Sequence, residues 1–159
     1  MSMQESISDE AKGLRAGIAD RAIWFHLLLK AAQEQGADSK KVSEQALTAF
    51  GKKAAESYGR MLKPADFVRA MDQGIGKEAF QSQEVKAEDD LAVLRLNYCP
   101  LVQAWKDYGL TPERIKTLCR LTQYGDCGRL WGSPLRLEFT SLISQGAEYC
   151  EIHVLPEKL

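Results

Sequence analysis

The chain has 159 residues, of which 45% are hydrophobic and 27% are charged, and its formal net charge is −1. This length and balance predict one globular domain, residues 1–159, and argue against extended disorder. A near-neutral chain lacks the basic excess that binding to nucleic-acid phosphates requires. The longest apolar run, 22–29, is too short to span a bilayer. The N-terminus has no basic segment of a secretory signal, so we expect a cytoplasmic protein that binds neither membranes nor nucleic acids.

The first part of the chain, residues 1–87, is predicted to be mainly helical. Apolar residues recur at helical spacing over 9–35, and a second apolar stripe runs through 42–62, with Ser39 as its expected N-cap. Pro64 fits the first turn of a third helix. These segments therefore predict a layer of helices, each with one apolar face.

The second part, residues 88–159, has a different texture and predicts a strand, two helices and a hairpin. Thr111 and Pro112 form a typical helix start, with Thr as the N-cap and Pro in the first position. The elements expected before the hairpin are a solvated connector (81–90), a strand (91–98), a helix (100–109), a second helix (111–125) and a loop (126–134).

The C-terminal hairpin is predicted from two alternating runs, 135–143 and 149–155, that are joined by a turn at 145–146. We therefore expect an α+β fold, in which an N-terminal helical layer packs on a small antiparallel sheet that ends in this β-hairpin. The pairs expected opposite one another are Leu137 with Val154, Phe139 with Ile152, Ser141 with Cys150, Glu138 with His153 and Thr140 with Glu151.

The four cysteines, Cys99, Cys119, Cys127 and Cys150, all lie in the second part of the chain. Their spacing contains no C-x-x-C pair, so we expect free thiols, no metal site and no cofactor. Such cysteines are either small buried hydrophobes or the lining of a common pocket. The spacing alone leaves both interpretations open.

A set of short motifs in the second part carries a resemblance to a known family. The segment 97–110 contains the pattern Cys-Pro-x3-Ala-Trp-x3-Gly-Leu. The other elements are Leu118-Cys119, Asp126, Ser133-Pro134, Glu138, Thr140 and Gly146-x3-Cys150. Together they resemble the L-2-amino-thiazoline-4-carboxylic acid hydrolase family. The resemblance implies an α+β fold and a hydrolase that opens a small cyclic amidine with water, acting on a carbon–nitrogen bond. A looser similarity to the 4-vinyl reductase type of ligand-binding domain implies a binding module instead.

Four residues are candidates for catalysis. Cys99 is the leading nucleophile, because it precedes a helix that begins near Pro100 and a helix N-terminus stabilises a thiolate. Glu138 and His153 either orient a general base or form a surface pair on a solvated face of the sheet. Asp126 either caps the preceding helix or reaches the pocket.

Four further residues are expected to line a substrate site: Cys119, Cys150, Trp105 and Thr140. We expect the thiols of Cys99, Cys119 and Cys150 to converge on one pocket between the helical layer and the sheet. A second function remains open, that of a non-catalytic small-ligand-binding domain or a thiol or metal sensor. The expected partner is a small molecule in each case, and a homo-oligomeric state stays open.

Overall fold

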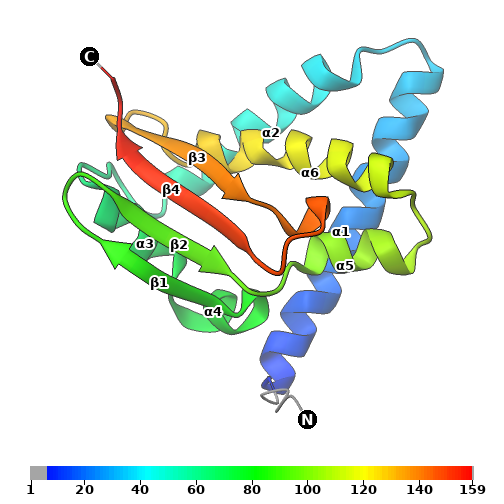
Figure 1. Ribbon diagram of the computed structural model, residues 1–159. Coiled ribbons are helices and arrows are strands. Elements are labelled where there is room, and N and C mark those ends of the chain that lie inside the picture. The colour runs from blue at the N-terminus through cyan, green and yellow to red at the C-terminus, as the bar shows by residue number, and fades with distance from the viewer. Residues whose placement is uncertain (1–6, 159) are drawn as a thin grey trace.

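The computed structural model describes residues 7–158, and within them a four-stranded antiparallel sheet is combined with helices that lie behind and beside it (Figure 1). The strand order is β1-β2-β4-β3, which confirms the predicted α+β fold. Residues 1–6, on which the expected absence of a signal sequence partly rests, lie outside the described part. The elements are α1 (Asp9–Glu34), α2 (Ser39–Ala55), α3 (Pro64–Met71), α4 (Gly74–Phe80), β1 (Ser82–Ala87), β2 (Ala92–Leu96), α5 (Pro100–Asp107), α6 (Pro112–Gly128), β3 (Leu135–Ser141), the 3-10 turn η1 (Ile143–Gln145) and β4 (Cys150–Pro156).

The helix starts follow local capping chemistry. The Thr111 side chain accepts a hydrogen bond from the Arg114 backbone N–H and caps α6, as predicted. The prediction for α2 was wrong by one residue. Its N-cap is Asp38, whose carboxylate accepts backbone hydrogen bonds from Lys40 and Lys41 at 3.0 and 3.2 Å. An aspartate there also carries a negative charge, which the positive end of the helix dipole stabilises.

The prediction of a polar connector over 81–90 is wrong, because Ser82–Ala87 forms the edge strand β1. Its only buried residue is Ser82, so apolar alternation gave no signal for a strand. The strand is held by antiparallel backbone pairing with β2, from Ser82 opposite Leu96 to Ala87 opposite Ala92. A polar edge strand of this kind also discourages further pairing with other chains.

The helix before the hairpin is longer than predicted. α6 continues to Gly128, so Asp126 and Cys127 lie in its last turns and not in a loop. Gly125 does not end the helix, since α6 packs here directly against α2. A Cβ atom on Gly51 of α2 would lie 2.7 Å from Cα of Gly128, closer than real side chains approach. The glycine-to-glycine crossing therefore determines where Asp126 stands relative to α2.

The C-terminal hairpin has the predicted register over most of its length. Leu137 pairs with Val154, Phe139 with Ile152 and Glu138 with His153. Beyond Phe139 the register shifts at a bulge and Ser141 lies opposite Glu151. The predicted pairs Ser141 with Cys150 and Thr140 with Glu151 are therefore wrong. The strands are joined by η1 and by Gly146 at φ +93°, instead of a two-residue turn. The extra length of this connection absorbs the shifted register.

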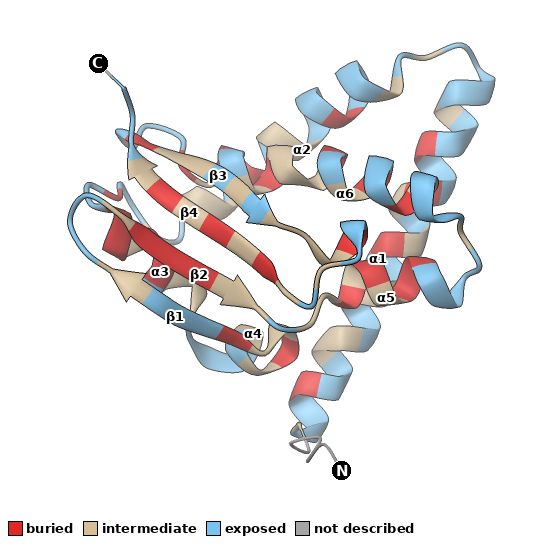
Figure 2. Ribbon diagram, in the orientation of Figure 1, coloured by how far each residue is buried: buried red, intermediate tan, exposed pale blue. Residues whose placement is uncertain are grey.

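Buried residues are concentrated on the two central strands, β2 and β4 (Figure 2). Leu94 and Ile152 lie on the inner face of the sheet, which packs against α3. No helix of residues 7–158 is long and apolar enough to cross a bilayer. A first apolar cluster, between α3 and the inner face, contains Met61, Phe67, Val68, Ala92, Leu94, Leu130, Leu135, Ile152 and Val154. A second, between α1, α5 and α6, contains Ala22, Leu29, Val102, Ala104, Trp105, Ile115, Leu118 and Leu121.

Candidate functional site

A cavity of about 630 Å³ lies between the inner face of the sheet and the helices α1, α2, α3 and α6. This volume is within the range of about 300–1,000 Å³ that is usual for small-molecule sites. Its charged lining residues are Arg21, Asp126 and Arg129. Most of the wall is apolar and consists of Trp24, Phe25, Leu28, Leu47, Phe50, Phe67, Met71, Phe80, Leu94, Leu96, Leu101, Phe139, Leu142 and Ile152.

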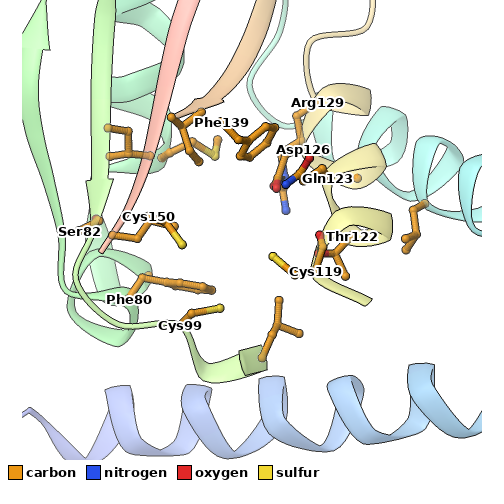
Figure 3. Close-up of a pocket in the computed structure, with 18 of the residues that line it drawn as sticks. Phe80, Ser82, Cys99, Cys119, Thr122, Gln123, Asp126, Arg129, Phe139 and Cys150 are labelled. Carbon is orange, nitrogen blue, oxygen red and sulfur yellow. Dashed lines mark hydrogen bonds and ion pairs between the residues drawn. The ribbon is translucent and has the colours of Figure 1, made fainter. Parts of the chain in front are cut away.

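Three of the four thiols meet in this cavity, as predicted. Cys99 follows β2, Cys119 lies on α6 and Cys150 begins β4, and their sulfur atoms point into the same space (Figure 3). The fourth, Cys127, is exposed and is not among the lining residues. All four are free thiols. Within residues 7–158 no three Cys, His, Asp or Glu side chains are arranged to hold a metal ion.

The expectation of a stabilised Cys99 thiolate is wrong. Cys99 does occupy the N-cap position of α5, but burial raises the pKa of its thiol to about 12. The nearby backbone of Val102 and Leu101 lowers the pKa only in part. Burial also raises the pKa of the Cys119 thiol and of the Cys150 thiol, to which the Ile143 N–H donates a hydrogen bond at 3.3 Å. At neutral pH these three thiols, which line the cavity, are therefore protonated and poor nucleophiles.

Asp126 is the one carboxylic acid among the described lining residues of the cavity. It projects from the last turns of α6 toward the space that the three sulfur atoms surround (Figure 3). Burial raises the pKa of its carboxyl to about 6, against the opposing effects of Arg129 and Arg21. The side chain keeps 42% of its surface accessible, and the residue lines the cavity. Of the two roles left open by the sequence, the structure thus supports the one in the pocket.

Two arginines accompany this carboxyl. Arg129, one helical turn beyond Asp126, holds its Nε 3.9 Å from the Asp126 Oδ1 and also donates a hydrogen bond to the Tyr58 hydroxyl. Arg21 comes from α1, and its guanidinium lies 5.8 Å from the centre of the Phe50 ring. Burial, followed by the charge of Arg129, lowers the pKa of Arg21. The polar part of the cavity is therefore built by α1 and α6 together.

Glu138 and His153 do not belong to this cavity. They face each other across β3 and β4, as predicted, but on the outer face of the sheet, because their neighbours Phe139 and Ile152 point inward. Glu138 pairs with Arg136, and His153 lies 3.0 Å from a Glu151 carboxylate oxygen. The surface-pair interpretation of these two residues is the one that the geometry supports.

Trp105 and Thr140 also lie outside the cavity lining. Trp105 is fully buried in the second apolar cluster, and its indole N–H donates to the Ala22 carbonyl at 2.9 Å. Thr140 is exposed at the bulge, with its hydroxyl 3.4 Å from the Glu151 carbonyl oxygen. The first is a core residue and the second a surface residue.

Arg21 and Arg129 line the cavity but were not among the residues predicted for the site. Both positions carried a signal, since Arg21, Phe25 and Leu28 share one face of α1 at helical spacing and Arg129 follows Asp126 by three residues. Arg129 was overlooked because the helix was expected to end at Gly125. A helix extended to Gly128 brings the two side chains onto one face.

The fold is shared with a solved structure of a different protein. A trafficking protein particle complex subunit 3 from Naegleria fowleri, covalently bound to palmitic acid, superimposes with a TM-score of 0.61 over 91% of this chain and 97% of that chain. The two sequences are 14% identical, so the similarity concerns the fold alone.

In sequence, no curated protein matches the chain. The model of the L-2-amino-thiazoline-4-carboxylic acid hydrolase family matches residues 15–154, which include all the lining residues of the cavity. This match extends over both the helical layer and the sheet, and the chain belongs to the L-2-amino-thiazoline-4-carboxylic acid hydrolase family.

Proposed function

We propose that the chain is a hydrolase that opens a small cyclic amidine in this cavity, with Asp126 as its acid–base group. The observation that carries the proposal is the Asp126 carboxyl, which lines an apolar cavity with its pKa raised to about 6. A group with a pKa near the working pH both accepts and returns a proton, which suits general acid–base catalysis. The family to which the chain belongs supplies the substrate class.

In the proposed reaction the ionised Asp126 carboxylate takes one proton from a water molecule as the water oxygen bonds to the amidine carbon, and the electron pair of the C=N double bond moves to the amidine nitrogen. The bond between that carbon and a ring heteroatom then breaks as the carbon–oxygen double bond forms. Asp126 returns its proton to the departing atom, and the remaining hydroxyl proton passes to the amidine nitrogen. The thiols of Cys99, Cys119 and Cys150 take no part in bond making, because burial keeps them protonated. Their role is to form part of the wall.

Purified protein would be incubated with L-2-amino-thiazoline-4-carboxylic acid in ¹⁸O-labelled water, and the product analysed by mass spectrometry. Incorporation of one ¹⁸O atom by the wild type and its loss in Asp126→Asn are the expected results. Glu138→Gln is the matched control, since it removes a carboxylate on the outer face of the sheet. Full turnover by Asp126→Asn would contradict the assigned role.

A second candidate function, holding an apolar molecule without turnover, is supported by the size of the cavity. The single ring of the acid named by the family is small against about 630 Å³. The structurally similar subunit is covalently bound to palmitic acid, which supports an apolar ligand here as well. Stoichiometric binding of such a ligand, together with no turnover of any amidine, would favour this function over the first.

A further inference from the structure

The charges of the cavity do not balance. Among its described lining residues, α1 contributes the Arg21 guanidinium, α6 contributes the Asp126 carboxyl and the C-cap of α6 contributes Arg129, whereas the lining residues of α2 are uncharged. The other titratable groups among the lining residues are the three thiols and the Tyr58 hydroxyl. The walls thus carry one positive charge in excess when Asp126 is ionised and two when it is protonated.

Arg21 is the cation without a close acidic partner. Asp126 lies within 4 Å of Arg129, and no ion pair within residues 7–158 includes Arg21. Its guanidinium lies 5.8 Å from the centre of the Phe50 ring, and the charges of Arg129 and Asp126 are close enough to shift the pKa of Arg21. Arg21 is an exposed residue that lines the cavity, and its planar guanidinium matches a carboxylate with two parallel hydrogen bonds.

The apolar part of the cavity continues from this cation in two directions. Toward the sheet the wall is formed by side chains such as Phe67, Leu94 and Ile152, which belong to the first apolar cluster. Toward solvent the lining includes Trp24 and Leu28, which are 68% and 58% exposed. Large apolar side chains left exposed beside an apolar cavity indicate a ligand with an extended apolar body.

We propose that the ligand of this cavity is an amphipathic monocarboxylate, whose acid group binds Arg21 and Arg129 and whose long alkyl or aryl body fills the space between the inner face of the sheet and α1. The inference rests on the proposed function for its location and extends it by naming the chemical class that the cavity selects. A substrate of this class would present its reactive carbon to Asp126, next to the anchored acid group.

The test measures binding of octanoate, decanoate and dodecanoate, each with its matched alcohol, by isothermal titration calorimetry. Each added methylene is expected to strengthen binding about fourfold, because it buries further apolar surface. Each carboxylate is expected to bind at least about tenfold more tightly than its alcohol, owing to the charged hydrogen bonds with arginine. Affinity that is the same for acid and alcohol, or that does not rise with chain length, would overturn the proposal.

Variants identify the anchor. Arg21→Met should weaken binding of dodecanoate about tenfold and leave dodecanol unchanged, and Arg21→Lys should retain part of the preference for the acid. Lys30→Met, which removes an exposed cation of the same helix outside the cavity lining, is the matched control. Unfolding curves would establish that each variant is folded. An unchanged preference for the acid in folded Arg21→Met would contradict the proposed anchor.

The Asp126→Asn variant tests the ligand class and the proposed hydrolysis independently of each other. Asp126→Asn removes the like charge beside the anchor, so it should bind dodecanoate at least as tightly as the wild type while turnover is lost. Chain-length-dependent binding without any amidine turnover would overturn the hydrolase alone. Turnover of the small family acid combined with no binding of the carboxylate series would overturn the ligand class alone.

Discussion

The two sides of the sheet place carboxyl groups in different surroundings, Glu151 on β4 at the outer face and Asp126 on α6 beside the inner face. On the outer face the half-buried Glu151 receives hydrogen bonds from Arg95 and His153, and these partners lower the pKa of its carboxyl. On the inner side, burial dominates around Asp126 and raises the pKa of its carboxyl to about 6. The direction in which a carboxyl pKa shifts therefore depends on whether burial or hydrogen-bonding partners dominate around it.

The largest expected difference between the two sides is in turnover. Asp126→Asn should lower kcat/KM for a cyclic amidine at least about a hundredfold, the usual effect of losing a general base. His153→Gln, on the outer face, should leave it within about twofold. In the wild type, kcat/KM should rise with pH and level off above about pH 6, because the base works in its ionised form and the pKa of Asp126 is raised to about 6. A rate that falls as pH rises through 6 would contradict this role.

The loss of unfolding free energy on truncation to alanine should differ between two adjacent residues of β4. Ile152 is buried on the inner face against the first apolar cluster, so Ile152→Ala should lower the free energy of unfolding by about 2–4 kcal/mol. His153→Ala, one residue later and on the outer face, should cost less than about 1 kcal/mol. Urea denaturation measures both. Equal losses would mean that the outer face is covered in solution.

Rising pH should change the free energy of unfolding in opposite directions through the Asp126 carboxyl on the inner side of the sheet and the Glu151 carboxyl on the outer side. A raised pKa in the folded state means that Asp126 destabilises the fold as pH rises from about 4 through 6. Asp126→Asn should therefore be more stable than the wild type at pH 7, by about 1 kcal/mol after allowance for the 42% exposure of the side chain, and this gain should vanish below about pH 4.

Glu151 provides the matched case on the outer face. Its lowered pKa stabilises the fold above the pKa of the unfolded chain, and this contribution is lost as pH falls through the folded-state pKa. Glu151→Gln should therefore cost about 0.5–1 kcal/mol at pH 7, and the difference from the wild type should disappear in acid. Thermal unfolding at several pH values would show both effects. Differences of the same sign at pH 7 would contradict the contrast between the two surroundings.

The features that were predicted correctly depend on short-range patterns. The hairpin register up to Phe139 followed from alternation, and the start of α6 followed from Thr111 and its capping hydrogen bond. The strand β1 could not be seen, because an edge strand is held by backbone pairing and needs little apolar sequence. The end of α6 was missed for a related reason, since its continuation past Gly125 depends on contact with α2.

For the site, the motif cysteines located the cavity but not its chemistry. The position of Cys99 before a helix is a local property and was correct. The surroundings that raise the pKa of its thiol are formed by segments distant in sequence, including Cys119 and Cys150. The same holds for Asp126, whose pKa depends on Arg21 of α1. The protonation state of a residue in a cavity depends on tertiary contacts. The spacing of motifs therefore predicts which residues line a site better than it predicts what each residue does there.

The smallest expected effect on turnover belongs to the thiols themselves. Cys99→Ala should keep kcat/KM within about fivefold of the wild type, because a thiol with a pKa of about 12 is almost fully protonated at neutral pH and supplies no nucleophile. Iodoacetamide should modify the exposed Cys127 first and Cys99 much more slowly, as peptide mapping by mass spectrometry would show. Cys127→Ala is the matched control, since it removes a thiol outside the cavity lining. A hundredfold loss of turnover in folded Cys99→Ala would restore the thiol as nucleophile, and would require that ligand binding bring a positive charge close enough to Cys99 to lower its pKa.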